Sequence, residues 1–141
     1  MEEKVLLDED FGKVSFFPEM RVGKILWKRK PDQEEYKKGF NTLLEFSKKE
    51  SRVDNFLSDI KDQGVVAPDS RKWFENVALP AAHEAGLRRA GVIIDGNIFK
   101  RYYVNMILKA TNKFGLPLKV FSSEDEAFKW FEKEMDKEPA S

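Results

Sequence analysis

The regular alternation of strand-like and helix-like segments after residue 53 restricts the fold of this chain most. Ala90–Asp95 is a continuous apolar run of strand length, which is typical of a strand covered on both faces. Other β-prone runs occupy Val53–Ile60 and Leu116–Phe121, and a helical pattern lies between each strand and the next. Strands that alternate with helices in this way pair in parallel through right-handed crossover helices. The second half of the chain therefore predicts a sheet with helices packed against it.

Four segments have helical periodicity. Asp32 and Glu35 have the spacing of a capping box before the first of them. Pro80 lies inside the second, where it lacks an amide hydrogen and is expected to kink or divide the helix. The predicted helices are Gln33–Glu50, a helix that starts at a cap on Asp69 or Ser70 and ends at Gly86, Phe99–Phe114, and a last helix capped by Ser122 or Ser123.

Three short strands precede these elements, at Lys4–Leu7, Lys13–Phe17 and Met20–Lys28, and we expect them to pair in antiparallel fashion. The full order is then β-β-β-α-β-α-β-α-β-α, an α/β sandwich whose mixed sheet is flanked by about four helices. The length of 141 residues fits one domain. We place that domain at residues 1–135 and expect residues 136–141 to form a disordered, charged tail.

Composition excludes several classes of function. The 25 basic residues balance the 25 acidic ones, so the chain lacks the excess charge of a general nucleic-acid binder. A local excess of Lys and Arg between Arg88 and Lys119 is either a patch for an anionic partner or a solvated face. Cysteine is absent, no apolar run has the length of a membrane span, and the start of the chain is acidic. We expect a cytoplasmic protein without a metal or another cofactor.

An acidic turn follows the strand that ends at Ile60, and it contains Asp59, Asp62 and Asp69. Together with Asp95, these carboxylates would bind Mg²⁺ if they converged, although turns and helix caps select Asp for their own geometry. Ser70 follows at the expected helix start beside Arg71, where it is either a cap or a phosphorylation site. We interpret Asp59, Asp62, Asp69, Ser70 and Arg71 as a surface for a protein partner.

Aromatic residues are numerous, with 12 Phe, 3 Trp and 3 Tyr. They either fill the core or leave an apolar cavity between the helices and the sheet. If a cavity is present, we expect Trp73, Phe99, Tyr103 and Phe114 to line it. The single histidine, His83, has no second histidine or cysteine with which to form a metal site. No phosphate-binding loop and no hydrolase motif occurs, so no catalytic residue is assigned.

Three stretches together resemble a known family. They are Phe56–Ile60 with Trp73 and Phe74, the run Ala90-Gly-Val-Ile-Ile, and the closing Phe121-Ser-Ser-Glu-Asp-Glu-Ala-Phe-Lys-Trp-Phe. The pattern is similar to the SpoIIAA-like branch of the STAS superfamily, small bacterial proteins often called STAS/SEC14-domain proteins. The likeness covers nearly the whole chain and rests on strand, turn and aromatic positions.

The resemblance implies two roles. In the anti-sigma-factor antagonists of this superfamily, a serine at the start of the helix after the acidic turn is phosphorylated by a partner kinase, and Ser70 lies at that place. Those antagonists carry Asp-Ser-Ser-Gly-Leu where this chain has Pro-Asp-Ser-Arg-Lys. In SEC14-like relatives, an apolar ligand lies beneath the helices. We therefore expect a non-enzymatic regulatory module that binds a protein partner, with a lipid or small apolar ligand as the alternative; a homodimer is compatible with both.

Overall fold

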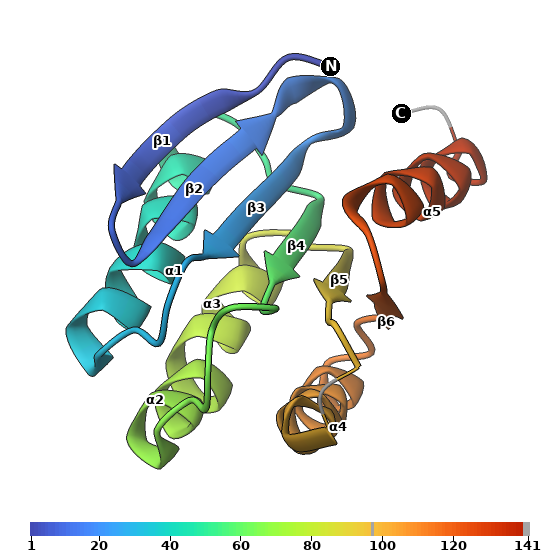
Figure 1. Ribbon diagram of the computed structural model, residues 1–141. Helices are drawn as coiled ribbons and strands as arrows, with labels where there is room; N and C mark the ends of the chain where they lie inside the picture. The colour runs from blue at the N-terminus through green and yellow to red at the C-terminus, as the bar shows by residue number, and fades with distance from the viewer. Residues whose placement is uncertain (97, 140–141) are drawn as a thin grey trace.

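A six-stranded mixed sheet forms the centre of the computed structural model (Figure 1), which describes residues 1–96 and 98–139, with only the backbone for residues 98–100. The strands lie side by side in the order in which they occur in the sequence. β1, β2 and β3 pair in antiparallel fashion, and the pairs from β3 to β6 are parallel. The strands are β1 (Lys4–Glu9), β2 (Gly12–Phe17), β3 (Val22–Trp27), β4 (Asn55–Asp59), β5 (Arg89–Ile93) and β6 (Leu118–Phe121).

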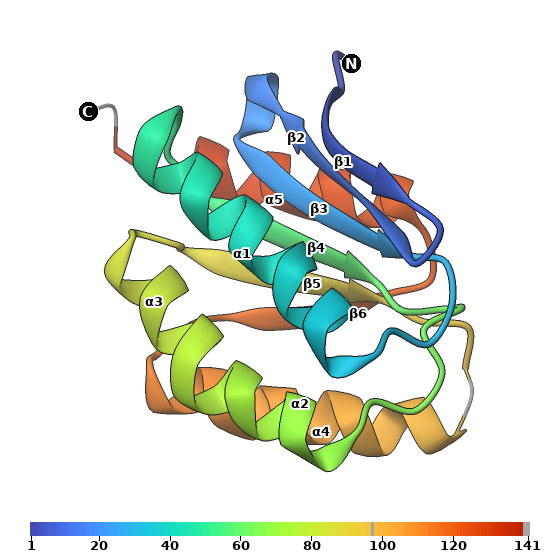
Figure 2. The same cartoon turned by 90° about the vertical axis from the view of Figure 1, so that its left-hand side faces the viewer.

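Helices cover both faces of this sheet. Figure 2 shows the first three crossover connections on the same face, in front of the sheet, and the last helix behind it. This arrangement confirms the predicted α/β domain with a mixed sheet and about four flanking helices. The elements are a 3-10 turn (Pro18–Met20), α1 (Gln33–Lys49), α2 (Pro68–Trp73) continued through a π-helical segment (Phe74–Ala78) into α3 (Leu79–Glu84), α4 (Ile98–Lys113) and α5 (Glu124–Asp136).

Two helix starts follow the predicted capping pattern. The amide of Glu35 donates to Asp32 Oδ1 at 2.8 Å, and the amide of Asp32 donates to Glu35 Oε1 at 3.0 Å, so both halves of the capping box before α1 are present. At α5, the amide of Glu126 donates to Ser123 Oγ at 3.3 Å. These side chains satisfy backbone amides that have no partner within the helix.

The start of α2 differs from the prediction. The helix begins at Pro68 after Ala67, and no side chain caps it, so Asp69 and Ser70 are not the cap. Proline suits the first helical position because its nitrogen carries no hydrogen that needs a partner. Pro80 divides the same helix as predicted: the amide of Leu79 donates to Phe74 O, five residues earlier, in the π-helical segment that precedes it.

The two faces of the sheet carry separate cores. The larger core lies under α1, α2, α3 and α4, and the smaller one under α5 is built from Phe17, Val22, Leu57, Ile93, Phe121, Ala127, Phe128 and Phe131. All residues of β5 are buried, as its apolar run predicts for a strand covered on both faces. Within the described residues, no helix has the length and apolar character needed to cross a membrane.

Ion pairs join the amino ends of the parallel strands to the end of α5. The buried carboxylate of Asp54 accepts from Arg52 Nε at 2.6 Å and from Arg21 Nε. Arg89 donates to Asn55 Oδ1 at 2.6 Å and also pairs with Glu138. Where we predicted a disordered tail from residue 136, the chain as far as Glu138 is therefore attached to the sheet.

We predict that Asp54→Asn lowers the free energy of unfolding by about 2 kcal/mol at neutral pH, because two guanidinium groups lose a charged acceptor. Burial alone would raise the pKa of Asp54, but the hydrogen bonds from Arg52 and Arg21 outweigh it and hold the pKa below its usual range. The stabilisation is therefore complete above the unfolded-state pKa of about 3.9 and is lost as the pH falls through the lower folded-state pKa.

Urea denaturation at neutral pH and at about pH 3 measures this effect. The difference between wild type and Asp54→Asn is expected to shrink at the acidic pH. Asp62→Asn is the matched control, because Asp62 is exposed and its change should stay within about 0.5 kcal/mol. Equal stabilities of the two variants at neutral pH would contradict the prediction.

Candidate functional site

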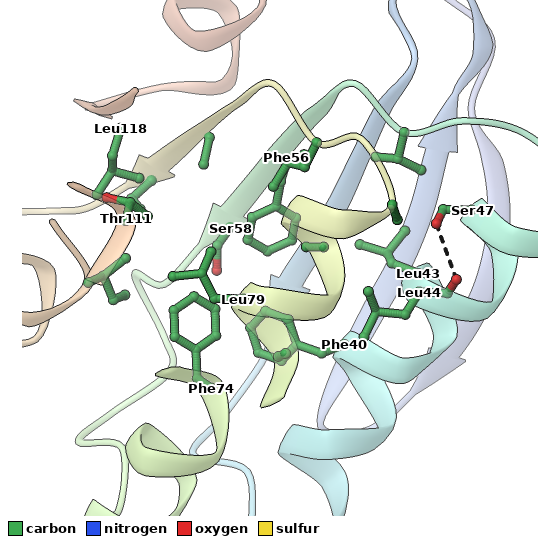
Figure 3. A pocket seen from close by; sticks show the side chains of 18 of the residues that line it. Phe40, Leu43, Leu44, Ser47, Phe56, Ser58, Phe74, Leu79, Thr111 and Leu118 are labelled. Atoms are coloured by element: carbon green, nitrogen blue, oxygen red, sulfur yellow. Dashed lines mark hydrogen bonds between the residues drawn. The ribbon is translucent and has the colours of Figure 1, made fainter. Parts of the chain in front are cut away.

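An apolar cavity of about 70 Å³ lies between the sheet and the helices that cover its larger core. Figure 3 shows the side chains of Phe40, Phe56, Phe74 and Leu79 drawn together around it. Every crossover helix of that face contributes to the wall. The lining residues are Phe40, Leu43, Leu44 and Ser47 of α1, Val53 before β4, Phe56 and Ser58 of β4, Phe74, Ala78, Leu79, Ala82 and Ala85 of the α2 to α3 element and its end, Leu87 before β5, Ala90 and Val92 of β5, Tyr103, Ile107 and Thr111 of α4, and Leu118 of β6.

The position of Phe56 shows how the cavity differs from the packed core. Phe56 lies on β4, which has a strand on each side, and its side chain packs beneath the helices, with its ring 5.7 Å from that of Phe40. A residue at such a position is normally fully buried, yet Phe56 is only half-buried. The ring of Phe56 therefore borders unfilled space in the middle of the covered face.

The hydroxyl groups in the wall are already occupied. Ser58 Oγ accepts from Trp27 Nε1 at 3.2 Å, Ser47 Oγ donates to Leu44 O at 3.2 Å, and Thr111 Oγ1 donates to Leu108 O at 3.0 Å. Figure 3 shows the Ser47 bond as a dashed line. These hydroxyls do not need a polar ligand, so most of the wall suits hydrocarbon.

Tyr103 brings the cavity wall into contact with a buried polar cluster, which consists of Tyr103, Tyr36, Gln63 and Arg71. The hydroxyls of Tyr103 and Tyr36 lie 2.8 Å apart. Burial raises the pKa of Tyr103 to about 12, although Tyr36, Gln63 and the charge of Arg71 oppose that rise. Burial also raises the pKa of Tyr36. Both phenols are therefore protonated at neutral pH.

Two members of the polar cluster have unsatisfied polar atoms. Gln63 is 1% exposed. Its amide lies close enough to the Tyr103 hydroxyl to lower the pKa of that phenol, but neither its amide oxygen nor its amide nitrogen forms a hydrogen bond of normal geometry. Arg71 Nε is also buried without a partner, and Arg71 Nη1 reaches only the thioether sulfur of Met106, at 3.3 Å. Buried groups of this kind are rare and call for a reason, because each loses its hydration without compensation.

The four residues predicted to line a cavity have different outcomes. Tyr103 lines it. Trp73 is not part of the wall, since it packs beside Tyr36, with ring centroids 6.1 Å apart, and lies under Lys37. Phe114 is also outside the wall and lies 5.2 Å from the His83 ring. The side chain of Phe99 lies outside the described residues.

The acidic residues do not form a metal site. Asp59 is buried and accepts from the amide of Lys61 at 3.2 Å, whereas Asp62, Asp69 and Asp95 are exposed. Within the described residues, no group of three or more His, Asp or Glu side chains is arranged to hold a metal ion. The convergence that Mg²⁺ binding requires is therefore not present there.

Ser70 is buried, with 3% of its surface exposed, because it is the third residue of α2 and faces the core. A kinase cannot reach its hydroxyl in this conformation, which argues against the predicted phosphorylation. Three residues of the basic segment have contacts within the chain: Arg88 and Arg89 pair with Glu138, and Lys119 lies over the Trp130 ring. His83 is exposed.

Sequence reasoning missed Gln63 and most of the cavity wall. Gln63 stands in a polar turn, Asp-Gln-Gly, and no signal in the sequence distinguishes it from the solvated residues beside it. Phe40, Leu43 and Leu44 have the spacing of one helical face in the sequence, but periodicity does not show whether such a face packs completely. Comparison of the chain with protein-family models, curated proteins and solved structures found no match.

We predict that Tyr103→Phe lowers the free energy of unfolding by about 1 to 2 kcal/mol at neutral pH, because the buried hydroxyl of Tyr36 loses its partner. The contribution of Tyr103 is complete below the unfolded-state pKa of about 10. It is lost as the pH rises toward about 12, the folded-state pKa. The variant should therefore lose less stability than wild type at alkaline pH.

Urea denaturation between about pH 7 and pH 11 tests both statements. Tyr102→Phe is the matched control on the same helix, because Tyr102 is 67% exposed and the loss of its hydroxyl should change stability by less than about 0.5 kcal/mol. If Tyr103→Phe is as stable as Tyr102→Phe at neutral pH, the paired hydroxyls do not stabilise the fold.

Proposed function

We propose that this chain is a binding module that holds a small apolar ligand in the cavity between the sheet and helices α1, α3 and α4. The observation that carries the proposal is a wall of aliphatic and aromatic side chains in which the Ser and Thr hydroxyls are already bonded within the protein. Such a wall excludes polar solutes and gains free energy when hydrocarbon replaces water. The proposal contains no catalytic step.

The size of the cavity limits the ligand. Its volume of about 70 Å³ compares with roughly 150 Å³ for an engineered cavity that binds benzene. A ligand of several carbon atoms therefore fits only if a wall moves outward. The wall most suited to this movement is the π-helical segment Phe74–Ala78, because π-turns interrupt regular helical bonding and are frequent at functional sites. Phe74 and Ala78 both line the cavity.

The family resemblance supports the same proposal, since a SEC14-like relationship implies an apolar ligand beneath the helices. The sequence also predicts a regulatory module of the STAS type that binds a protein partner in the cytoplasm. Both this role and this location stay predictions. Exposure of Asp62 and Val65 before α2, and of Asp69 in its first turn, is compatible with such a surface. Because Ser70 is buried, the hydroxyl that a kinase would phosphorylate does not lie on the accessible surface.

Ala82→Leu is expected to abolish binding of an apolar probe, because Ala82 lines the cavity and the larger side chain fills it. Hexanol is a suitable uncharged probe, and isothermal titration calorimetry of wild type and variant measures its affinity. Stability should stay the same or rise by up to about 1 kcal/mol, as is common for variants that fill a cavity.

Ala81→Leu is the matched control. Ala81 precedes Ala82 on α3, is half-buried as well, and does not line the cavity. It adds the same side chain to the same helix, so it should bind hexanol as wild type does. Equal binding of hexanol by both variants would overturn the proposed function.

A further inference from the structure

The polar cluster beside the cavity contains more donors than its own acceptors use. Two phenol groups carry two hydroxyl protons, and the bond between Tyr36 and Tyr103 uses only one of them. The amide nitrogen of Gln63 and the Nε of Arg71 add further N–H groups that form no hydrogen bond of normal geometry. Gln63 Oε1 is the one acceptor of the set that is also unsatisfied.

The charge of the cluster is positive and not neutralised. The structure gives Arg71 no carboxylate partner among the described residues; its recorded contact is with the sulfur of Met106, which is a weak acceptor. The contact with Met106 brings Arg71 of α2 against α4, one turn from Tyr103. The charge of Arg71 and the amide of Gln63 both lower the pKa of Tyr103, so the guanidinium and the amide lie on the side of α4 that carries this phenol. One guanidinium with N–H and O–H donors beside it favours a ligand head group that carries a single negative charge and accepts several hydrogen bonds.

We propose that the ligand is an amphiphile, a short- or medium-chain carboxylic acid whose carboxylate is held by Arg71, Gln63 and Tyr103 while its hydrocarbon chain fills the apolar cavity. This inference rests on the proposed function, because the chain needs the cavity. The Tyr103 side chain connects the two parts, since it lines the cavity and carries the hydroxyl of the polar cluster.

A carboxylate fits this cluster better than other head groups. A phosphate ester carries a charge of about −1.5 to −2 at neutral pH, and one guanidinium does not neutralise it. An alcohol head group would accept hydrogen bonds but leave the charge of Arg71 unpaired. A carboxylate has two oxygens that together accept several hydrogen bonds, and it displaces only the weak sulfur contact.

The test compares hexanoate, hexanol and hexyl phosphate, which share a hydrocarbon chain and differ in the head group. Wild-type protein is expected to bind hexanoate at least about tenfold more tightly than hexanol, as one charge-assisted hydrogen bond suffices for that ratio. Arg71→Met and Gln63→Met keep an unbranched side chain and remove the head-group donors. Each should weaken hexanoate about tenfold and change hexanol by less than about twofold.

Lys72→Met is the matched control, because Lys72 is the exposed neighbour of Arg71 on α2 and its replacement removes the same charge. It should bind hexanoate as wild type does. Urea denaturation of each variant shows whether it folds, and the comparison of the three probes on wild-type protein needs no variant. That comparison alone overturns the inference if hexanol or hexyl phosphate binds as tightly as hexanoate.

The outcomes separate the two proposals. Equal binding of hexanoate and hexanol leaves the apolar cavity as a binding site and removes the carboxylate. Tight binding of hexanoate that Arg71→Met and Gln63→Met do not weaken also overturns the assignment of the head-group site. The failure of all three probes to bind wild-type protein overturns the proposed function itself.

Discussion

The packing of Trp27 fixes the geometry on which the rest of the larger core depends. Its indole is fully buried on β3, stacks on Tyr36 with ring centroids 5.5 Å apart, and donates to Ser58 on the neighbouring strand. A Cβ on Gly39 would lie 2.9 Å from Trp27 Cη2, so only glycine lets α1 approach the ring so closely. This contact holds α1 against the sheet and sets the position of Tyr36, which carries the bond to Tyr103 on α4.

The two halves of the covered face consequently differ in how well they are filled. Around Trp27 the rings of Phe11, Tyr36 and Phe40 pack within about 6.3 Å of the indole centroid, at the separations usual for aromatic pairs. Toward α3 the wall includes Ala78, Ala82 and Ala85 beside the larger Phe74 and Leu79, and the small side chains leave space. The cavity lies at the boundary between a rigid aromatic half and a half with small residues and an irregular helix.

Periodicity and turn chemistry predicted the architecture well, because each element is specified within a short stretch. The apolar run of β5, the face of α1 and the caps at Asp32 and Ser123 depend on neighbours only a few residues away. The start of α2 was placed incorrectly because Asp69 and Ser70 have good capping chemistry, whereas Pro68 in fact occupies the first helical position. The site depends on contacts between residues that are distant in the sequence, because Gln63, Arg71 and Tyr103 come together only when the crossover helices pack against one another. A cavity also cannot be predicted from the pattern of residue types, because that pattern does not show whether the side chains fill the space between them.

The unsatisfied groups of the polar cluster lower the stability of the free protein and would strengthen the binding of a ligand that satisfies them. A buried polar group without a partner costs about 1 to 3 kcal/mol, and Gln63 and Arg71 both carry such atoms. The fold tolerates this cost because the core under α5 lies on the other face of the sheet and is packed independently of the polar cluster. A ligand that supplies acceptors there recovers a cost already present in the free protein, so its head group gains more than the same contacts would at an exposed site. The hydrocarbon cavity determines what size of molecule enters, and the polar cluster determines which head group it carries.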